Sequence, residues 1–288
     1  MSASIPFNGE IITSRQNRRI VELMKLDDRR AREKTRTFRF DGVKLLCEAI
    51  RRGVEPDSVF LRAGTADKVA ERMQELYGYT LSDVGCPIFG VEDSLFEKIS
   101  QENAPEGVIT VAKYIDKFHK NIIIYNRDGI DLGDGSVILL ESVRDPLNVG
   151  AIIRSAAALG VGHLILSADC ADVYHPRTVR AAMGPLFSMP ITRVEDLPET
   201  IRALRREGRR VYAAALDDTA LRLGSPAWAE EQGRSTAACA AIGNEGHGLS
   251  EEAVSACDRS VYIPLEADTE SLNAGVAAAL IMWEICKK

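Results

Sequence analysis

A glycine-rich segment, GNEGHGLS at residues 243–250, carries the clearest chemical signal in this sequence. Its three glycines, Gly243, Gly246 and Gly248, allow tight bends and close approach to a ligand, because a residue without a Cβ atom tolerates positive φ. The apolar run before it predicts a buried strand, and Ser250 with the two glutamates after it predicts the start of a helix. A glycine loop between a strand and a helix is a common ligand-binding corner of a parallel sheet. Taken alone, the segment is explained equally well by a tight turn without a ligand.

Two other segments hold polar residues of types suited to catalysis. Asn148 and Arg154 lie six residues apart in an apolar, alanine-rich stretch, with Asn148 expected in the loop before a helix and Arg154 inside it. Ser271 and Asn273 open an apolar C-terminal segment, where Ser271 is expected as the helix cap and Asn273 just inside the helix. Glu245 is the only carboxylate within the glycine loop. Considered singly, a salt bridge explains Arg154, a solvated charge explains Glu245, and capping explains Ser271.

The order of these segments resembles a known family. NVGAIIRSA at 148–156, GNEGHGLS at 243–250 and IPLEADTESLN at 263–273 resemble the three signature motifs of the SpoU, or TrmH-type, RNA methyltransferases of the SPOUT superfamily. The resemblance runs from about Val137 to the C-terminus, close to half of the chain. The matching positions are Asn148, Arg154, Gly243, Glu245, Gly246, Gly248, Ile263, Pro264, Ser271, Leu272 and Asn273.

The resemblance implies a SPOUT catalytic domain with a trefoil knot, which transfers a methyl group from S-adenosylmethionine to a ribose 2′-hydroxyl of RNA. It implies cofactor binding by Gly243, Gly246, Gly248, Ile263, Leu265 and Leu272, and catalytic roles for Asn148, Arg154, Glu245, Ser271 and Asn273. We interpret Arg154 as binding an RNA phosphate and stabilising the alkoxide, because a guanidinium gives up a proton reluctantly. The resemblance also implies a homodimer that completes each active site across its interface, and the C-terminal helix, apolar nearly all round, suits such packing.

Three classes of function stay open. The first is an RNA 2′-O-methyltransferase, with ribosomal RNA as the expected substrate and transfer RNA as the alternative. The second is a non-catalytic RNA-binding protein with the same fold, although the complete set of polar motif residues argues against it. The third is a nucleotide-dependent enzyme for a small molecule, but the loop reads GxxGxG rather than GxGxxG and lies late in the chain.

Composition narrows the class of protein. The 288 residues suffice for two ordinary domains, and 45% hydrophobic with 27% charged residues is typical of a globular protein. No apolar run reaches the length of a membrane helix and no secretory signal is visible, so we expect a cytoplasmic protein without a membrane partner. The six cysteines and four histidines are scattered, so we expect no metal.

The basic charge is concentrated near the N-terminus, although the net charge is −6. Residues 14–52 hold thirteen Lys or Arg against six Asp or Glu. Within them, residues 18–40 have the pattern of a basic amphipathic helix, with Ile20, Leu23, Met24 and Leu26 on its apolar side. This tract is either an ordinary solvated face or a surface that contacts RNA phosphates and releases their counterions.

Two α/β halves are expected. The first has strand-like runs at 37–40, 58–62, 87–91 and 107–112 and helical stretches at 43–52, 65–76 and 93–100, and it resembles the L30e-like substrate-binding domain of many SpoU enzymes. The second has strand-like runs at 136–141, 163–167, 210–216, 237–243 and 260–265 and helical stretches at 149–159, 175–183, 197–207, 250–256 and 272–286. This alternation predicts a parallel sheet covered on both faces. We place the L30e-like RNA-binding domain at 1–118, a linker at 119–134 and the SPOUT domain at 135–288.

Overall fold

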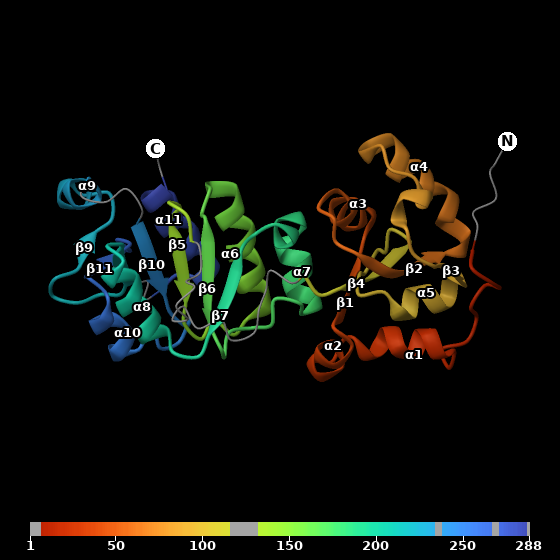
Figure 1. Ribbon diagram of the computed structural model, residues 1–288, viewed down its shortest axis with the longest axis horizontal. Helices are drawn as coiled ribbons and strands as arrows, with labels where there is room; N and C mark the ends of the chain where they lie inside the picture. Colours follow the sequence, from red (N-terminus) through yellow and green to blue (C-terminus); the bar gives the residue numbers. More distant parts are fainter. Residues whose placement is uncertain (1–6, 116–131, 234–237, 267–270, 287–288) are drawn as a thin grey trace. The chain divides into compact units, whose positions relative to one another are not determined.

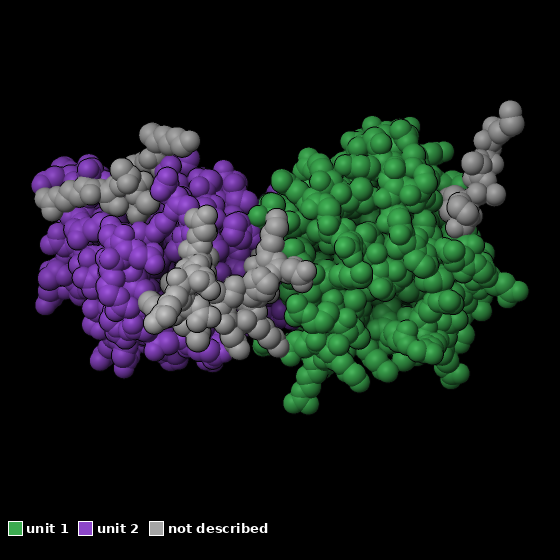
Figure 2. Space-filling model, in the orientation of Figure 1, with its two compact units in different colours: residues 1–115, 174–188 green, residues 116–173, 189–288 purple. Residues whose placement is uncertain are grey.

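The computed structural model describes residues 7–115, 132–233, 238–266 and 271–286 (Figure 1). The chain forms two compact units, one of residues 1–115 with 174–188 and one of residues 116–173 with 189–288 (Figure 2). The segment 174–188 therefore belongs to the first unit although its sequence lies within the second. The linker at 119–134 stays a prediction, because residues 116–131 lie outside the described ranges. No helix in those ranges is long and apolar enough to cross a membrane.

The first unit is built on a four-stranded sheet with helices on both faces. Its strands are β1 (Thr37–Asp41), β2 (Pro56–Arg62), β3 (Ile88–Val91) and β4 (Val108–Lys113), in the order β1-β4-β2-β3. Strand β4 runs antiparallel to β1 and β2, and β3 runs parallel to β2. Its helices are α1 (Arg18–Lys25), α2 (Arg29–Thr35), α3 (Val43–Arg51), α4 (Ala66–Tyr77), α5 (Asp93–Ile99) and α7 (Pro176–Ala182), with short 3-10 turns η1 (Ala63–Thr65), η2 (Leu81–Val84) and η3 (Gly184–Phe187). The strands and helices predicted for this half all occur, with small shifts at their ends.

Two hydrophobic cores cover the two faces of this sheet, because successive side chains of a strand point to opposite faces. Phe60 and Ile109 belong to the core formed with α1 and α5. Val59 and Val108, their neighbours in sequence, belong to the core formed with α3 and α4. The sheet is thus buried on both sides.

The basic tract forms two helices rather than the single helix predicted from the sequence. Helix α1 ends at Lys25, and Asp28 starts α2 by accepting hydrogen bonds from the backbone N–H groups of Arg30 (2.7 Å) and Ala31 (3.2 Å). Aspartate is a strong helix N-cap, so the chain restarts there.

Two arginines of the tract, Arg32 and Arg39, are buried. Arg32 is almost fully enclosed, and its guanidinium donates hydrogen bonds to the carbonyl oxygens of Leu26 (2.7 Å) and Asp27 (3.0 Å). It therefore ties α2 to the end of α1 and offers no charge to a ligand. Ile20, Leu23 and Leu26 are buried as predicted.

The segment 174–188 packs on the first unit through aromatic side chains. The ring of Tyr174 lies 4.8 Å from that of Phe38, and the ring of Phe187 lies 5.5 Å from that of Phe40, measured between centroids. Phe38 and Phe40 alternate along β1 and so point to the same face of the sheet. The segment covers this face beside α3.

The described part of the second unit contains a parallel sheet of seven strands. The strands are β5 (Val137–Leu140), β6 (His163–Ser167), β7 (Ile191–Val194), β8 (Arg210–Ala214), β9 (Leu221–Arg222), β10 (Ala238–Ile242) and β11 (Arg259–Tyr262), in the order β7-β6-β5-β10-β8-β11-β9. The helices are α6 (Pro146–Leu159), α8 (Leu197–Arg206), α9 (Pro226–Gln232), α10 (Glu251–Ala256) and α11 (Ala274–Cys286). The sequence did not predict β7, β9 or α9, because such short elements carry little periodicity.

Helices cover both faces of this sheet (Figure 1). Leu197, Ile201 and Leu204 of α8 and Ala253 of α10 share one core with inward side chains of β5, β8 and β10. Helices α6 and α11 pack against each other on the other face. This three-layer arrangement is the predicted α/β fold class.

Candidate active site

The three motifs meet at one edge of the sheet. Strand β5 leads into α6, β10 leads into the glycine loop, and β11 leads into Ile263. Since the strands are parallel, their carboxyl ends lie at the same edge, where ligands bind in open α/β sheets.

Helix α6 starts earlier than the sequence predicted, so Asn148 lies in its first turn rather than in the preceding loop. Asp145 accepts a hydrogen bond from the backbone N–H of Leu147 (2.9 Å), and Pro146 occupies the first helical position. Proline is favoured there because its fixed φ suits a helix start. Asn148 is consequently held in a rigid element and is only 6% exposed.

The side chain of Asn148 joins all three motifs. Its amide Nδ2 donates to the carboxylate of Glu245 in the glycine loop, and its Oδ1 accepts from Nδ2 of Asn273 (2.8 Å). The partners are 97 and 125 residues away in the sequence. The two bonds fix which end of each amide faces which neighbour.

Asn273, and not Ser271, caps the C-terminal helix. Helix α11 begins at Ala274, and Oδ1 of Asn273 accepts from the backbone N–H groups of Gly275 (3.0 Å) and Val276 (3.3 Å). Ser271 is exposed and makes no hydrogen bond with the described residues. Serine and asparagine are about equally good caps, so the sequence alone did not choose between them.

The glycine loop is closed on itself. The backbones of Asn244 and Gly248 exchange hydrogen bonds of 3.0 and 2.9 Å, and Gly248 has φ of 69°. A Cβ atom added to Gly243 would lie 2.0 Å from the carbonyl carbon of Gly248, so no other residue fits there. The backbone N–H of Gly246 donates to Oδ1 of Asn244 (2.8 Å). This short loop needs glycine at 243 and 248 for steric reasons.

Two residues after β5 anchor the glycine loop, and the sequence analysis did not single them out. The carboxylate of Glu141 accepts from both the backbone N–H and the hydroxyl of Ser250 (2.7 Å each). The carbonyl of Ser142 accepts from Nδ2 of Asn244 (2.9 Å). The sequence carries one signal for Glu141, because it is a lone acidic residue at the end of the apolar run SVILLE.

A polar network built on Asp169 holds the loop between β5 and α6. Its carboxylate accepts from the hydroxyls of Ser142 (2.6 Å) and Ser167 (2.6 Å) and from the guanidinium of Arg144 (3.0 Å). Partial burial opposes ionisation, but these hydrogen bonds outweigh it and lower the pKa of Asp169 to about 2. The network secures Ser142, whose φ of 56° is unusual for a residue with a Cβ atom.

A cavity of about 430 Å³ opens beside the third motif. Its lining residues are Ala214, Ala215, Leu216, Val261, Tyr262, Ile263, Leu265, Glu266, Leu272, Ala277 and Ile281. Three predicted cofactor residues are among them, whereas the three glycines of the loop are not. The wall at 214–216 was expected to be strand, but β8 ends at Ala214. In the described part of the chain, no three His, Cys, Asp or Glu side chains are placed to hold a metal ion.

Arg154 stands apart from the Asn148 network within its own chain. It is exposed and has no hydrogen-bond or ion-pair partner among the described residues. Six residues along a helix correspond to a rotation that places Arg154 roughly 120° from Asn148. Arg154 lies seven residues, close to two full turns, after Leu147. It therefore lies on the same face of α6 as the exposed side chain of Leu147.

Comparison with known proteins agrees with the motifs and the fold. The model of the SpoU rRNA methylase family matches residues 135–283, and that of the MRM3-like substrate-binding domain matches residues 17–110. The 23S rRNA (guanosine(2553)-2'-O)-methyltransferase RlmP of Bacillus subtilis is 27% identical over 274 residues, which cover 95% of this chain and 98% of RlmP.

Solved structures show the same likeness over nearly the full length of the chain. The AdoMet-bound rRNA methyltransferase from Sinorhizobium meliloti superposes with a TM-score of 0.77 at 26% identity, covering 96% of this chain and 97% of that one. The SpoU methyltransferase AviRb from Streptomyces viridochromogenes, in complex with AdoMet, gives 0.75 at 26% identity, with 94% and 98% covered. The resemblance and the two-part α/β fold are confirmed, and the trefoil knot stays a prediction. Because a family model spanning all three motifs covers more than half of the chain, this protein belongs to the SpoU rRNA methylase family.

Proposed function

We propose that this protein transfers a methyl group from S-adenosylmethionine to a ribose 2′-hydroxyl of ribosomal RNA. The observation that carries the proposal is the hydrogen-bonded line Glu245–Asn148–Asn273, which joins the three family motifs at the ligand-binding edge of the sheet. The name of RlmP, a ribosomal RNA 2′-O-methyltransferase, supports the choice of acceptor and of RNA. We expect the protein to act in the cytoplasm.

The cavity at the third motif fits S-adenosylmethionine. Its volume lies within the range of about 300–1,000 Å³ found for small-ligand sites. Ile263, Leu265 and Leu272 give it apolar walls for a purine, and residues 263–266 follow β11 outside the sheet, so their backbone N–H and C=O groups can meet a polar ligand. The cofactor, when bound, supplies the methyl group. Gly243, Gly246 and Gly248 shape the adjoining loop rather than the wall of this cavity.

Each catalytic candidate has a role consistent with its position. Glu245 accepts from Asn148 and so sets the orientation of its amide, and Asn273 couples that amide to the start of α11. Arg154 would bind the RNA phosphate and stabilise negative charge on the 2′-oxygen, since electrostatic stabilisation by a fixed cation is effective in such reactions. Ser271, exposed two residues before Asn273, stays a catalytic candidate on the resemblance alone.

Exposed apolar side chains on α6 and α11 support a homodimer. Leu147, Val276, Leu280 and Trp283 are all exposed, with Trp283 at 58%. On α11 the three positions repeat every three or four residues and therefore share one face. Arg154 shares the α6 face of Leu147, so a second copy covering this surface would meet Arg154 and could receive it in its own active site.

Mixing two inactive variants tests this arrangement. Arg154→Ala and Asn273→Asp should each be inactive as homodimers while keeping S-adenosylmethionine affinity in titration calorimetry with a chelator present. If Arg154 acts in the partner's site, dimers exchanged between the two variants regain one intact site, and a random mixture recovers about a quarter of wild-type activity. No recovery in dimers shown to have exchanged would place Arg154 in the site of its own chain.

The RNA substrate is tested by mapping 2′-O-methyl groups in RNA from cells with and without the protein. We expect one ribosomal nucleotide to lose its methyl group and transfer RNA to be unchanged. A loss confined to transfer RNA would overturn the ribosomal assignment. An unchanged map, together with no S-adenosylmethionine binding at millimolar concentration, would favour a non-catalytic RNA-binding protein.

A further inference from the structure

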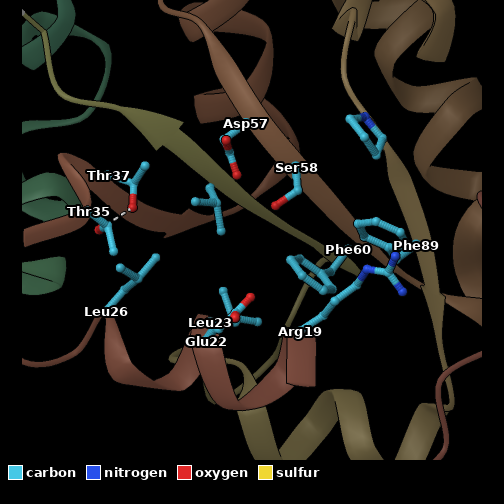
Figure 3. A pocket seen from close by; sticks show the side chains of 12 residues that line it. Arg19, Glu22, Leu23, Leu26, Thr35, Thr37, Asp57, Ser58, Phe60 and Phe89 are labelled. Atoms are coloured by element: carbon cyan, nitrogen blue, oxygen red, sulfur yellow. Dashed lines mark hydrogen bonds between the residues drawn. The ribbon is translucent and has the colours of Figure 1, made fainter. Parts of the chain in front are cut away.

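A second cavity lies in the first unit, between α1 and the sheet (Figure 3). Its volume is about 490 Å³, again within the range of small-ligand sites. Leu23, Phe60 and Val111 make its surface largely apolar, while Asp57 and Ser58 project into it from β2. The proposed methyl transfer uses none of these residues.

A β-bulge directs both polar side chains of β2 to the cavity. Pro56 pairs with Ala112 and Ser58 pairs with Val111, so Asp57 is an extra residue in the ladder between β2 and β4. In a regular strand, neighbours point to opposite faces, whereas a bulge re-aims a side chain and is often found at functional sites. Figure 3 shows Asp57 and Ser58 both pointing from the sheet toward α1.

The side-chain polar groups of Asp57 and Ser58, a carboxylate and a hydroxyl, make no hydrogen bond within the described fold. A neighbouring cation, Lys113, donates instead to Glu55 (2.7 Å). The carboxylate of Asp57 is therefore a hydrogen-bond acceptor available to a ligand at the cavity wall.

Arg19 supplies a stacking surface at the same cavity. Its guanidinium lies over the ring of Phe89, with Cζ 4.2 Å from the ring centroid. Glu22, one turn further along α1, is bound to Arg18 (2.8 Å) and leaves Arg19 without a carboxylate partner in the described structure. A planar guanidinium supported on an aromatic ring can stack on a nucleobase with its outer face.

From these features we infer that the cavity takes a single unstacked guanine of the RNA substrate. The inference rests on the proposed function for the presence of RNA. Guanine presents two adjacent donors, N1–H and the 2-amino group, which a carboxylate such as Asp57 can accept together. Adenine presents an acceptor at N1, which the same carboxylate repels. RNA is commonly recognised through unpaired bases that stack on arginine and are read on their Watson–Crick edge.

The charge around the cavity suits the phosphates of such a strand. Lys25 and Lys34 directly precede the lining residues Leu26 and Thr35, and both are exposed without a carboxylate partner among the described residues. Arg30 on α2 is also exposed, and its guanidinium has no carboxylate partner among the described residues. Such cations attract the backbone while the base enters the cavity.

The test measures binding by the full chain without S-adenosylmethionine, using fluorescence anisotropy. The probes are uridine-rich oligoribonucleotides carrying one guanosine, one inosine, which lacks the 2-amino group, or one adenosine. Wild type should bind the guanosine RNA about tenfold more tightly than the adenosine RNA, with inosine between them. Asp57→Asn, which preserves volume, should lose this preference.

Arginine variants separate stacking from charge. Arg19→Ala and Arg19→Lys should both weaken binding of the guanosine RNA about tenfold, because lysine restores charge but not the planar surface. Arg15→Ala is the matched control, since it removes one positive charge just before α1, outside the cavity and without an ion-pair partner among the described residues, and it should keep the guanosine preference. Thermal unfolding of each variant confirms that it folds.

Equal binding of guanosine and adenosine RNA by wild type, or an unchanged preference in Asp57→Asn, overturns the inference. Guanosine monophosphate that binds as tightly as the guanosine RNA also overturns it, because the occupant would then be a free nucleotide. A guanosine preference in a protein that methylates no RNA would refute only the proposed function. Methyl transfer by a protein without the preference would refute only this inference.

Discussion

Shortening the chain to residues 132–288 is expected to leave the cofactor cavity intact but to release the segment that carries α7 and η3. In the full chain Tyr174 and Phe187 are 3% and 1% exposed, and they pack on Phe38 and Phe40, which the shortened chain lacks. Burial of a large apolar side chain stabilises by about 1.5–3 kcal/mol, so the two together lose about 3–6 kcal/mol. A loss of this size favours the open form of the segment by roughly two to four powers of ten.

Limited digestion with chymotrypsin, which cleaves after aromatic residues, measures this opening. Cleavage after Tyr174 or Phe187 should be at least about a hundredfold faster in the shortened chain than in the full chain, because cleavage follows the population of the open form. Addition of a separate fragment of residues 7–115 should slow it again. S-adenosylmethionine affinity should be unchanged, because every lining residue of its cavity lies in the second unit. Equal cleavage rates in the two chains would refute the assignment of this segment to the first unit.

Three further changes test the catalytic network, the loop before α6 and the basic tract. Asn273→Asp keeps the cap of α11 but faces Oδ1 of Asn148 with a second acceptor. Methyl transfer should therefore be lost, while the melting temperature should fall only by about 2–4 °C, the effect of one lost hydrogen bond; unchanged activity would contradict the network. Because its folded-state pKa is lowered from 3.8 to about 2, Asp169 stabilises the fold fully above about pH 4 and progressively less as pH falls toward 2. Denaturant midpoints of Asp169→Asn should therefore be lower at neutral pH and fall less over that interval, and parallel curves would exclude this role. The double charge reversal Arg30→Glu with Lys34→Glu should weaken binding to all RNA sequences alike. The slope of the logarithm of the binding constant against the logarithm of the salt concentration should fall by about one for each lost phosphate contact. An unchanged slope would show that the basic tract is only a solvated surface.

Local sequence patterns were sufficient to predict most strands, the glycine loop and the family of this protein. Apart from β7 and β9, the strands of both halves follow from runs of apolar residues, because each strand buries side chains in a fixed alternation or on both faces. Gly243 and Gly248 could be assigned to a tight loop because only glycine tolerates their backbone geometry and close contacts. The order of three motifs was enough to identify the family, and through it the expected chemistry.

The tertiary structure decided which polar groups meet. The bonds of Asn148 to Glu245 and Asn273 span 97 and 125 residues, and they depend on the strand order that brings β5 and β10 together. Local sequence equally allowed Ser271 as the cap and Arg32 as a surface charge. Likewise, the bulge at Asp57 is defined by the pairing of β2 with β4, which the sequence of β2 alone does not determine. Backbone conformation is governed by neighbours in sequence, whereas hydrogen-bond partners and burial are governed by distances between segments, which only the packed fold establishes.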